Sequence, residues 1–252
     1  MTKTRTGIQG LDELIGGGFV EGSTILLSGC TGTGKTIFGL QFLYSGAKRF
    51  GEPGIFVTLE TRPKELRTEA LQFGWDLQDL EDQKKVVIID AASSKAGLPT
   101  SEKHTLRRGF DMSGLAEEVY RAVEEINARR LVIDSLSGLG IQFSEPSEVR
   151  NELFRIGALL GELNVTSLFI GEVNDPSALS RAGVEQFVVQ GLIVLSLSEV
   201  EGVLQRDLLI WKMRQTTHSM KKHPLIIAEK GIEIDVSRPE RKNPRVHRTA
   251  SN

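Results

Sequence analysis

The sequence has little of several residue types that would mark a specialised class of protein. Cys30 is its single cysteine, so no disulfide can form within the chain, and this composition is typical of a reducing cytoplasm. No apolar run approaches the roughly 20 residues that a membrane-spanning helix needs, and the amino-terminal residues lack the apolar centre of a signal peptide. These absences exclude a disulfide framework and predict a cytosolic (cytoplasmic) protein with no membrane partner.

The sequence also has no excess of charge of one sign. Lysine and arginine number 31 against 33 acidic residues, so no overall field draws the chain to nucleic acid or to an anionic membrane. Any such contact must be local. Hydrophobic residues make up 39% and charged residues 25% of the 252 residues, which is typical of a globular protein large enough for one substantial core or two small ones. We therefore expect one main domain.

Short apolar segments alternate with longer helical patterns through the first two-thirds of the chain. The predicted strands are Thr24–Ser28, Ile55–Leu59, Val86–Ile89, Leu131–Ile133 and Ser167–Ile170. The predicted helices are Lys35–Arg49, Pro63–Phe73, Leu115–Asn127 and Glu148–Leu163. The strands are almost continuously apolar, as buried parallel strands are, and strand–helix alternation predicts an α/β fold with a mostly parallel sheet flanked by helices.

The last third of the chain has a different pattern. Its strand-like segments come in pairs joined by glycine-containing turns, Glu201-Gly202 in the first pair and Lys230-Gly231 in the second. The segments are Leu192–Leu197, Leu208–Met213, Leu225–Ile227 and Ile232–Val236. We expect C-terminal antiparallel hairpins that extend the sheet, within a single domain over residues 1–236.

Two segments have no clear pattern. Ala91–Ser113 is too long for a simple connection, and connections of this length without structure of their own are usually functional or mobile. Residues 237–252 form a basic tail that contains Arg238, Arg241, Lys242, Arg245 and Arg248. We expect this tail to be disordered, and contact with an anionic partner is the alternative.

A glycine-rich segment, GCTGTGKT, joins the first predicted strand to the first predicted helix. It fits the pattern G-x4-G-K-[ST] of phosphate loops, in which backbone N–H groups and a helix amino terminus surround a polyphosphate. Lys35 would neutralise the β- and γ-phosphates of ATP, and Thr36 would bind the Mg²⁺ that bridges them. The predicted nucleotide-binding residues are Gly29, Thr31, Gly32, Thr33, Gly34, Lys35, Thr36 and Ile37. The alternative is a glycine-rich turn that carries lysine and threonine by chance.

Two of the other predicted strands end in carboxylates. Asp134 follows the strand Leu131–Ile133, at the carboxyl edge where open parallel sheets bind ligands, and we assign it to the shell of the Mg²⁺. Glu60 follows the second strand and would reach the same edge, where it would act as general base or orient the attacking water. Without a phosphate loop, Asp134 would be interpreted as a turn cap and Glu60 as a residue of a first helical turn.

Further segments resemble a known family. The lead-in Thr6–Phe19, the phosphate loop, the strand ends VTLE and VIDS, and the segments Gly183–Phe187 and Trp211–His218 resemble single-domain KaiC-like ATPases of the RecA superfamily. The resemblance covers nearly all of residues 4–236. It implies a RecA-like P-loop NTPase core that self-associates into rings, usually hexamers, with ATP held between subunits.

The resemblance also implies a contact between neighbouring subunits. In such proteins a Lys-x-Arg on a carboxyl-terminal strand reaches the γ-phosphate bound by the neighbour, and here the matching residues are Lys212 and Arg214. Their spacing places both side chains on one face of a strand. The alternative is that these charges protect an exposed edge strand from aggregation. His218 lies close to the pair in the sequence and is either a helper or an ordinary surface residue.

Three positions bear on how far the resemblance extends. They either differ from the residue that relatives carry or distinguish clock-type relatives from recombinases. Glu60 is followed by Thr61, whereas clock-type relatives carry two adjacent glutamates, so we expect slow hydrolysis. Glu172 stands where recombinases place a glutamine, which disfavours a recombinase. Gln190 stands where relatives often have aspartate, so contacts to adenine are not transferred to it.

Together these features favour a Mg²⁺-dependent ATPase that hydrolyses ATP to ADP and phosphate, with Lys35 and Glu60 acting in one subunit and Lys212 and Arg214 reaching from the next. One alternative is an ATP-gated assembly or signalling scaffold with little turnover. Another is an accessory ATPase of DNA recombination or repair, in which Arg107-Arg108 and the basic tail would contact phosphates. Neither segment interleaves aromatic residues as single-strand binders do, so nucleic acid is possible but not favoured as a partner.

Overall fold

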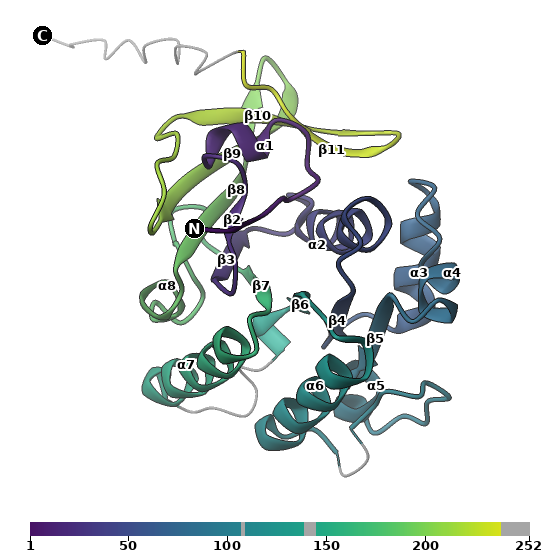
Figure 1. Cartoon of the computed structure of the whole chain (residues 1–252). Helices are drawn as coiled ribbons and strands as arrows, with labels where there is room; N and C mark the ends of the chain where they lie inside the picture. Colours follow the sequence, from purple (N-terminus) through teal and green to yellow (C-terminus); the bar gives the residue numbers. More distant parts are fainter. Residues whose placement is uncertain (107–108, 139–144, 238–252) are drawn as a thin grey trace, which may run out of the picture.

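The structure, a computed structural model, describes residues 1–106, 109–138 and 145–237 (Figure 1). Strands β1 (Lys3–Thr4) and β2 (Phe19–Val20) form a small antiparallel sheet. The other strands are β3 (Thr24–Gly29), β4 (Gly54–Thr58), β5 (Val86–Asp90), β6 (Arg130–Asp134), β7 (Thr166–Glu172), β8 (Gly191–Val200), β9 (Val203–Met213), β10 (Lys222–Ala228) and β11 (Gly231–Ile234). They form one sheet in the order β11-β10-β9-β8-β3-β7-β6-β4-β5. The strands from β8 to β5 in this order are parallel, and β9, β10 and β11 add antiparallel pairings.

The predicted α/β architecture is confirmed. Every predicted strand overlaps an observed one, and the predicted hairpins are β8–β9 and β10–β11, which extend the parallel sheet beyond β3. Arg107, Arg108 and the arginines of the basic tail lie outside the described residues. The domain boundary at residue 236 therefore stays a prediction.

Helices cover both faces of the sheet (Figure 1). They are α1 (Leu11–Leu14), α2 (Lys35–Ser45), α3 (Pro63–Leu71), α4 (Leu77–Asp82), α5 (Ala91–Ala96), α6 (Met112–Ile126), α7 (Pro146–Glu162) and α8 (Glu185–Val188), and α2 continues as a π-helical turn, Gly46–Phe50. One hydrophobic core contains residues of α2, α3 and α4, and the other contains residues of α6 and α7. Among the described residues, no helix has both the length and the apolar character needed to cross a lipid bilayer.

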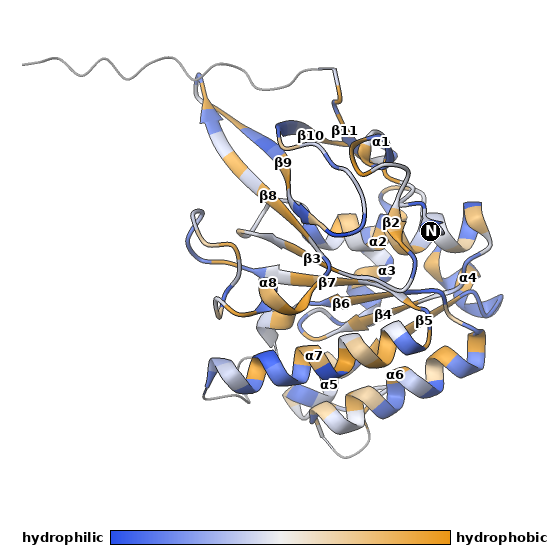
Figure 2. Ribbon diagram, turned by 60° about the vertical axis from the view of Figure 1, so that its left-hand side comes forward, coloured by the Kyte–Doolittle hydropathy of each residue, from blue (hydrophilic) through white to orange (hydrophobic). Residues whose placement is uncertain are grey.

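The alternation of side chains along each strand supplies both cores. On β3, Ile25 and Leu27 belong to the core under α2, whereas Leu26 belongs to the core under α6 and α7. Figure 2 shows the central strands as largely hydrophobic and the outer faces of α6 and α7 as more hydrophilic. Burial on both faces explains why the parallel strands are almost continuously apolar in sequence.

The expectation of an irregular segment over Ala91–Ser113 is partly wrong. Its first residues form α5, whose amino end is capped by Asp90, since the Asp90 carboxylate accepts the N–H of Ser93 at 2.9 Å. Its last residues begin α6, which is capped in the same way by Asp111. Both caps are Asp residues that the sequence shows, but short polar helices such as AASSKA lack the apolar periodicity on which the prediction relied.

The amino edge of the sheet is held by a buried arginine. Arg130, the first residue of β6, is fully buried, and its Nε and Nη2 form an ion pair with Glu52 at 2.7 and 2.6 Å. The other contacts of the guanidinium are to backbone: Nη1 donates to the carbonyl of Phe42 and Nη2 to that of Arg5, at 2.8 and 2.7 Å. One side chain thus joins the amino-terminal segment, α2 and β6.

Candidate nucleotide-binding site

The segment between β3 and α2 is a loop whose shape requires its glycines. Gly32 and Gly34 have φ values of +82° and +97°, in the left-handed region that favours glycine. A Cβ on Gly29 would lie 2.6 Å from the carbonyl oxygen of Leu195 on β8, so this glycine permits two backbones to approach closely. The loop ends at α2, where Gly34 provides no side-chain cap for the first N–H groups of the helix. Uncapped N–H groups at a helix amino terminus are suited to bind an anion.

Lys35 lies within this loop and is surrounded by carboxylates. Its Nζ donates to the carbonyl oxygen of Cys30 at 2.8 Å. Burial lowers the pKa of Lys35, and the negative fields of Glu172, Asp134 and, more weakly, Glu60 oppose that change. Among the described residues, the Cys30 carbonyl is the one hydrogen-bond partner of the ammonium, which leaves two of its three donors for a ligand.

Thr36 and Asp134 meet at the carboxyl edge of the sheet. Thr36 Oγ1, in the first turn of α2, donates to Asp134 Oδ2 at 2.6 Å. Burial raises the pKa of Asp134 to about 6, and the charge of Glu60 adds to the rise, while the bond from Thr36 and the charge of Lys35 oppose it. No ion pair within the described residues neutralises this carboxylate. A half-buried carboxylate in this state would be stabilised by a cation.

Glu60 lies at the same edge, two residues after β4 ends. It is exposed, and within the described residues no hydrogen bond or ion pair fixes its carboxylate. The backbone before it is fixed, because the N–H of Leu59 donates to the carbonyl oxygen of Asp134 at 2.7 Å. The charge of Glu60 acts on both Lys35 and Asp134. The structure brings Glu60 to the edge that the sequence indicates, and its catalytic role stays a prediction.

Glu172 contacts the loop although the sequence pattern did not select it. It ends β7 and is paired with Gly29 in the parallel ladder. Its carboxylate accepts a hydrogen bond from the hydroxyl of Thr31, and its backbone N–H donates to Ser137 Oγ at 3.3 Å. The sequence could have indicated Glu172 by the same argument as Asp134. Both are carboxylates at the carboxyl end of a parallel strand, the edge where such sheets bind ligands.

Arg206 is a second contact that the sequence did not indicate. It lies on β9, and its Nε donates to the carbonyl oxygen of Gly32 at 3.0 Å. The antiparallel pairing of β8 with β9 brings it there, because Arg206 is opposite Leu197, close to the level of the loop. No local motif predicts such a contact, since it depends on the register of two strands.

Lys212 and Arg214 lie away from the phosphate loop of their own chain. Lys212 pairs with Leu192 of β8, which pairs with Leu26 of β3, three residues before the loop begins at Gly29. Lys212 is therefore about 10 Å from the loop in the direction along the strands. It is a further distance of about 10 Å from the loop in the direction across the sheet, because two strand spacings separate β9 from β3. Lys212 Nζ instead donates to the carbonyl oxygens of Gln186 and Val189, both at 2.7 Å. Arg214 is exposed.

The lysine and the arginine therefore have different surroundings. Lys212 holds the end of α8, and burial lowers its pKa, with the nearby charge of Arg214 adding to the effect. The Arg214 side chain faces solvent, and its backbone N–H donates to the carbonyl of Gln190 at 3.0 Å. Neither side chain can serve the phosphate loop of the same chain in this geometry.

A family model described as KaiC, an ATPase, matches residues 4–238. The chain belongs to the KaiC family of ATPases. A UPF0273 protein of Thermotoga maritima is 42% identical over 234 residues, which cover 92% of this chain and 95% of that protein. The circadian clock oscillator protein KaiC of Synechococcus elongatus is 39% identical over 236 residues, 93% of this chain but 44% of the clock protein.

A solved structure agrees with these sequence matches. The crystal structure of a KaiC-like protein from Pyrococcus horikoshii OT3 is similar to this KaiC-family chain with a TM-score of 0.81 and 42% sequence identity. The match covers 93% of this chain and 99% of that one. The resemblance to single-domain KaiC-like ATPases and their RecA-like fold is therefore confirmed.

Three remaining residues have structural contacts in this KaiC-family chain. Gln190 Oε1 accepts the N–H of Thr24 at 2.9 Å, so its side chain fixes the start of β3. His218 Nδ1 lies 3.1 Å from the carbonyl oxygen of Ser219. Ile37 is half-buried and packs against the core that contains α2. Its side chain contributes to packing, so only its backbone N–H is suited to a phosphate.

The side chains at the carboxyl edge fit a Mg²⁺ ion that is shared with a nucleotide. Thr36 and Asp134 supply the hard oxygen ligands that Mg²⁺ prefers, and in nucleotide sites Mg²⁺ usually takes one or two protein oxygens together with waters and phosphates. Within the part of the chain that the structure describes, no group of three or more His, Cys, Asp or Glu residues is placed to hold a metal ion. This KaiC-type site is therefore suited to a metal–nucleotide complex and not to a free metal ion.

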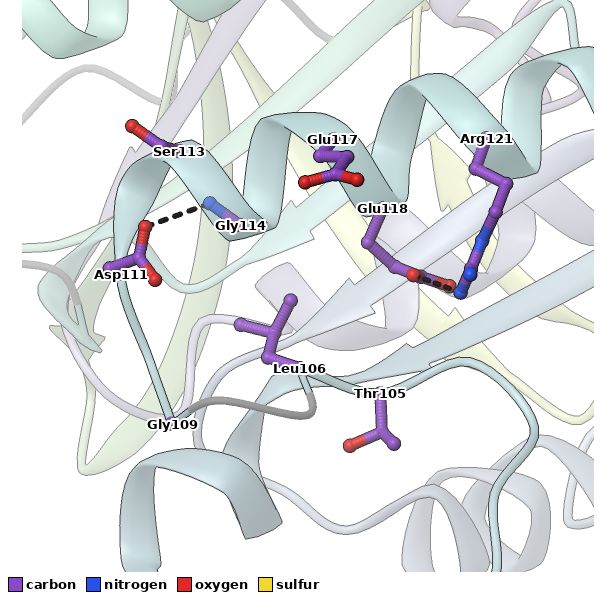
Figure 3. Close-up of a pocket in the computed structure, with 9 residues that line it drawn as sticks. All are labelled: Thr105, Leu106, Gly109, Asp111, Ser113, Gly114, Glu117, Glu118 and Arg121. Atoms are coloured by element: carbon purple, nitrogen blue, oxygen red, sulfur yellow. Dashed lines mark hydrogen bonds and ion pairs between the residues drawn. The ribbon is translucent and has the colours of Figure 1, made fainter.

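A cavity of about 390 Å³ lies elsewhere, between the segment around Leu106 and the start of α6 (Figure 3). Two of its charged side chains bind one another: Arg121 donates to Glu118, which also contacts His104 Nδ1 at 2.8 Å. The carboxylate of Asp111 accepts the N–H of Gly114 at 2.8 Å. None of its lining residues belongs to the predicted nucleotide site, and we assign no function to it.

Proposed function

We propose that this protein binds ATP together with Mg²⁺ at the carboxyl edge of the sheet and hydrolyses it slowly to ADP and phosphate, at the interfaces between subunits of a ring. A hexamer is the expected ring. The observation that carries the proposal is the 2.6 Å hydrogen bond between Thr36 and Asp134 beside the ammonium of Lys35. Membership of an ATPase family supports the same chemistry.

Each residue of the loop would have a separate role. The backbone N–H groups from Gly29 to Ile37 would surround the phosphates, and Lys35 would offset their charge. Thr36 and Asp134 would hold the Mg²⁺, which when bound neutralises negative charge on the β- and γ-phosphates. Glu60 would orient the attacking water and accept its proton, since its exposed carboxylate is able to turn toward the γ-phosphate.

The position of Lys212 and Arg214 supports a role in the neighbouring subunit. Both lie two strands away from the loop of their own chain, and the exposed Arg214 side chain is available to a second copy. A cation that reaches a phosphate from the next subunit typically contributes a large factor to the rate. Lys212 would reach that phosphate only after releasing the carbonyls of α8, so Arg214 is the stronger candidate for this contact.

Mixed rings test whether the site is shared between subunits. Lys35→Ala and Arg214→Ala would each lower phosphate release about 100-fold or more when assayed alone. Mixing the two variants should restore activity, because a subunit with an intact Lys35 then meets a neighbour with an intact Arg214. When equal amounts mix at random in a ring with heterologous interfaces, about a quarter of the sites combine an intact Lys35 with an intact Arg214 from the neighbour. The measurement is steady-state phosphate release over a series of mixing ratios.

Two results would contradict the proposal. If Arg214→Ala keeps full activity, the arginine does not act on the phosphate. If both variants are inactive and the mixture gains nothing although mass measurements show mixed rings, the site is not shared between subunits. Wild-type protein mixed with Lys35→Ala is the control for simple dilution of active sites.

A scaffold with little turnover is the second candidate. It is favoured by the segment Glu60-Thr61, which offers one carboxylate and no second one beside it. Light scattering with ATP and with a non-hydrolysable analogue distinguishes the two functions. Equal assembly with both nucleotides and no measurable phosphate release would favour the scaffold.

A further inference from the structure

The contact between Thr31 and Glu172 has no part in the ATPase chemistry described above. Thr31 is exposed in the loop, and its hydroxyl donates to the Glu172 carboxylate at the end of β7. The backbone of Glu172 is held on both sides, by pairing with Gly29 and by its N–H bond to Ser137 Oγ. The contact therefore joins the phosphate loop to the end of β7 and, through Ser137, to the 3-10 turn Leu136–Gly138 that follows β6.

A carboxylate is an unexpected group at this position. A phosphate loop binds anions, and a negative charge fixed against it opposes the ligand. A hydrogen bond to Thr31 alone would need no charge, since the amide oxygen of a glutamine accepts it equally well. Of the carboxylates around Lys35, Glu172 has the strongest effect on the ammonium, which the phosphate-loop pattern directs to the β- and γ-phosphates.

We infer that Glu172 discriminates between nucleoside triphosphate and nucleoside diphosphate, because Thr31 holds its carboxylate against the phosphate loop, where its charge opposes the additional negative charge of a γ-phosphate. The diphosphate lacks the γ-phosphate and is less affected. This inference rests on the proposed function, since it assumes that the loop binds ATP. It adds a residue that sets the relative affinity for substrate and product.

As a consequence, the affinity for the diphosphate product, relative to that for the triphosphate, is higher than it would be without the charge of Glu172. Removing the charge should strengthen binding of the triphosphate and leave that of the diphosphate nearly unchanged. Removing the threonine hydroxyl should have a smaller effect in the same direction, because the carboxylate keeps its charge but is no longer fixed beside the loop.

The test is the affinity of the full chain for Mg²⁺–ADP and for a Mg²⁺-bound non-hydrolysable ATP analogue, measured by calorimetry. We expect Glu172→Gln to raise the ratio of triphosphate to diphosphate affinity about three- to tenfold, the effect of one charge at a few ångströms in a partly buried site. Thr31→Val should raise it about twofold, since the charge remains. Glu199→Gln removes an exposed carboxylate from β8 and is the control for net charge.

The thiol of Cys30 gives an independent readout of binding. It is the single cysteine of the chain, it is half-buried, and it lies in the loop beside Thr31. Both nucleotides should slow its alkylation, and the nucleotide concentrations that give half protection should reproduce the calorimetric ratios. Thermal unfolding of each variant checks that the substitutions leave the fold intact.

The outcomes separate this inference from the proposed function. An unchanged affinity ratio in Glu172→Gln, or an equal change in Glu199→Gln, would overturn the role of Glu172 while leaving the ATPase intact. If the wild-type protein binds neither nucleotide by calorimetry or by thiol protection, the proposed function itself fails.

Discussion

Strand β6 begins at the fully buried Arg130 and ends at the half-buried Asp134, and the fold treats these two charges differently. Arg130 is fully paired: Glu52 and two backbone carbonyls accept its N–H groups, and its guanidinium lies 4.5 Å from the centre of the Phe42 ring. Asp134 accepts one side-chain hydrogen bond, from Thr36, and burial raises its pKa. In the part of the chain that the structure describes, the charge at one end of the strand has an ion pair and the charge at the other end has none.

This difference assigns Arg130 to the stability of the fold and supports the proposal that Asp134 binds a ligand. A buried ion that is paired and hydrogen-bonded is tolerated, and removal of a partner is costly. A buried carboxylate without an ion pair destabilises the folded chain until a cation binds there. The charge at the amino edge of the sheet is therefore paired within the protein, and the carboxylate at the carboxyl edge is the one that the proposed metal–nucleotide complex would use.

The largest expected effect comes from Asp134→Asn. Phosphate release should fall about 100-fold or more, because a Mg²⁺ ligand is lost. The same change should raise the free energy of unfolding of the metal-free protein by about 1–3 kcal/mol, because an ionised carboxylate with a raised pKa costs folding energy at pH 7. Chemical denaturation in the presence of a chelator measures the second effect.

The pH dependence checks the same carboxyl. Its folded-state pKa of about 6 lies above the ordinary value of 3.8, so its contribution to stability is lost as pH rises through this window. The metal-free wild type should gain stability from this group between pH 7 and pH 4, and Asp134→Asn should lack that gain. A lower stability of Asp134→Asn at pH 7 would contradict the comparison between the two ends of β6.

At the opposite end, Arg130→Met should lower the free energy of unfolding by about 2–4 kcal/mol, because it removes the cation that pairs with Glu52 and one N–H donor from each of two carbonyl groups. Nucleotide affinity, measured well below the melting temperature, should change less than about threefold, since the residue lies at the far edge of the sheet. Glu52→Gln is the milder control, because it keeps an acceptor for the guanidinium. Loss of nucleotide binding in folded Arg130→Met would show that the two edges are coupled.

A smaller effect is expected from Lys212→Met. The substitution removes the donors to the carbonyls of Gln186 and Val189, and we expect the free energy of unfolding to fall by about 1–2 kcal/mol. Hydrogen exchange should increase in residues 186–190. Lys212→Arg, which keeps several donors, is the control. Unchanged stability and exchange in Lys212→Met would mean that the lysine is not held by α8 in solution.

Local sequence patterns were sufficient to predict the parts of the structure that depend on residues close together in the chain. The phosphate loop, the strand ends at Asp134 and Glu60, and the alternation of strands and helices all follow from short segments whose chemistry is visible. Helix α5 was not predicted, because a six-residue polar helix depends on its Asp90 cap and on packing against the sheet. Helix α4 was not predicted either, and it is likewise a six-residue helix whose amino end is capped by an aspartate, Asp76.

Register and burial account for what the patterns did not indicate. The sequence selected Lys212 and Arg214 by resemblance, but the pairing of β9 with β8 shows that they lie away from the loop of their own chain. Arg206 reaches the loop through the same register. Spacing along a strand gives the face on which a side chain lies, and it does not give the distance to a loop two strands away.

By itself, the sequence determined that this chain forms a KaiC-type α/β fold with a phosphate loop, because both follow from residues that are close together in the chain. Only the tertiary structure decided that Glu172 contacts the loop, that Arg130 has an ion pair while Asp134 has none among the described residues, and that Lys212 is held by α8. These properties depend on which distant strands are neighbours and on how much water remains around each charge, and neither quantity is encoded in a local segment.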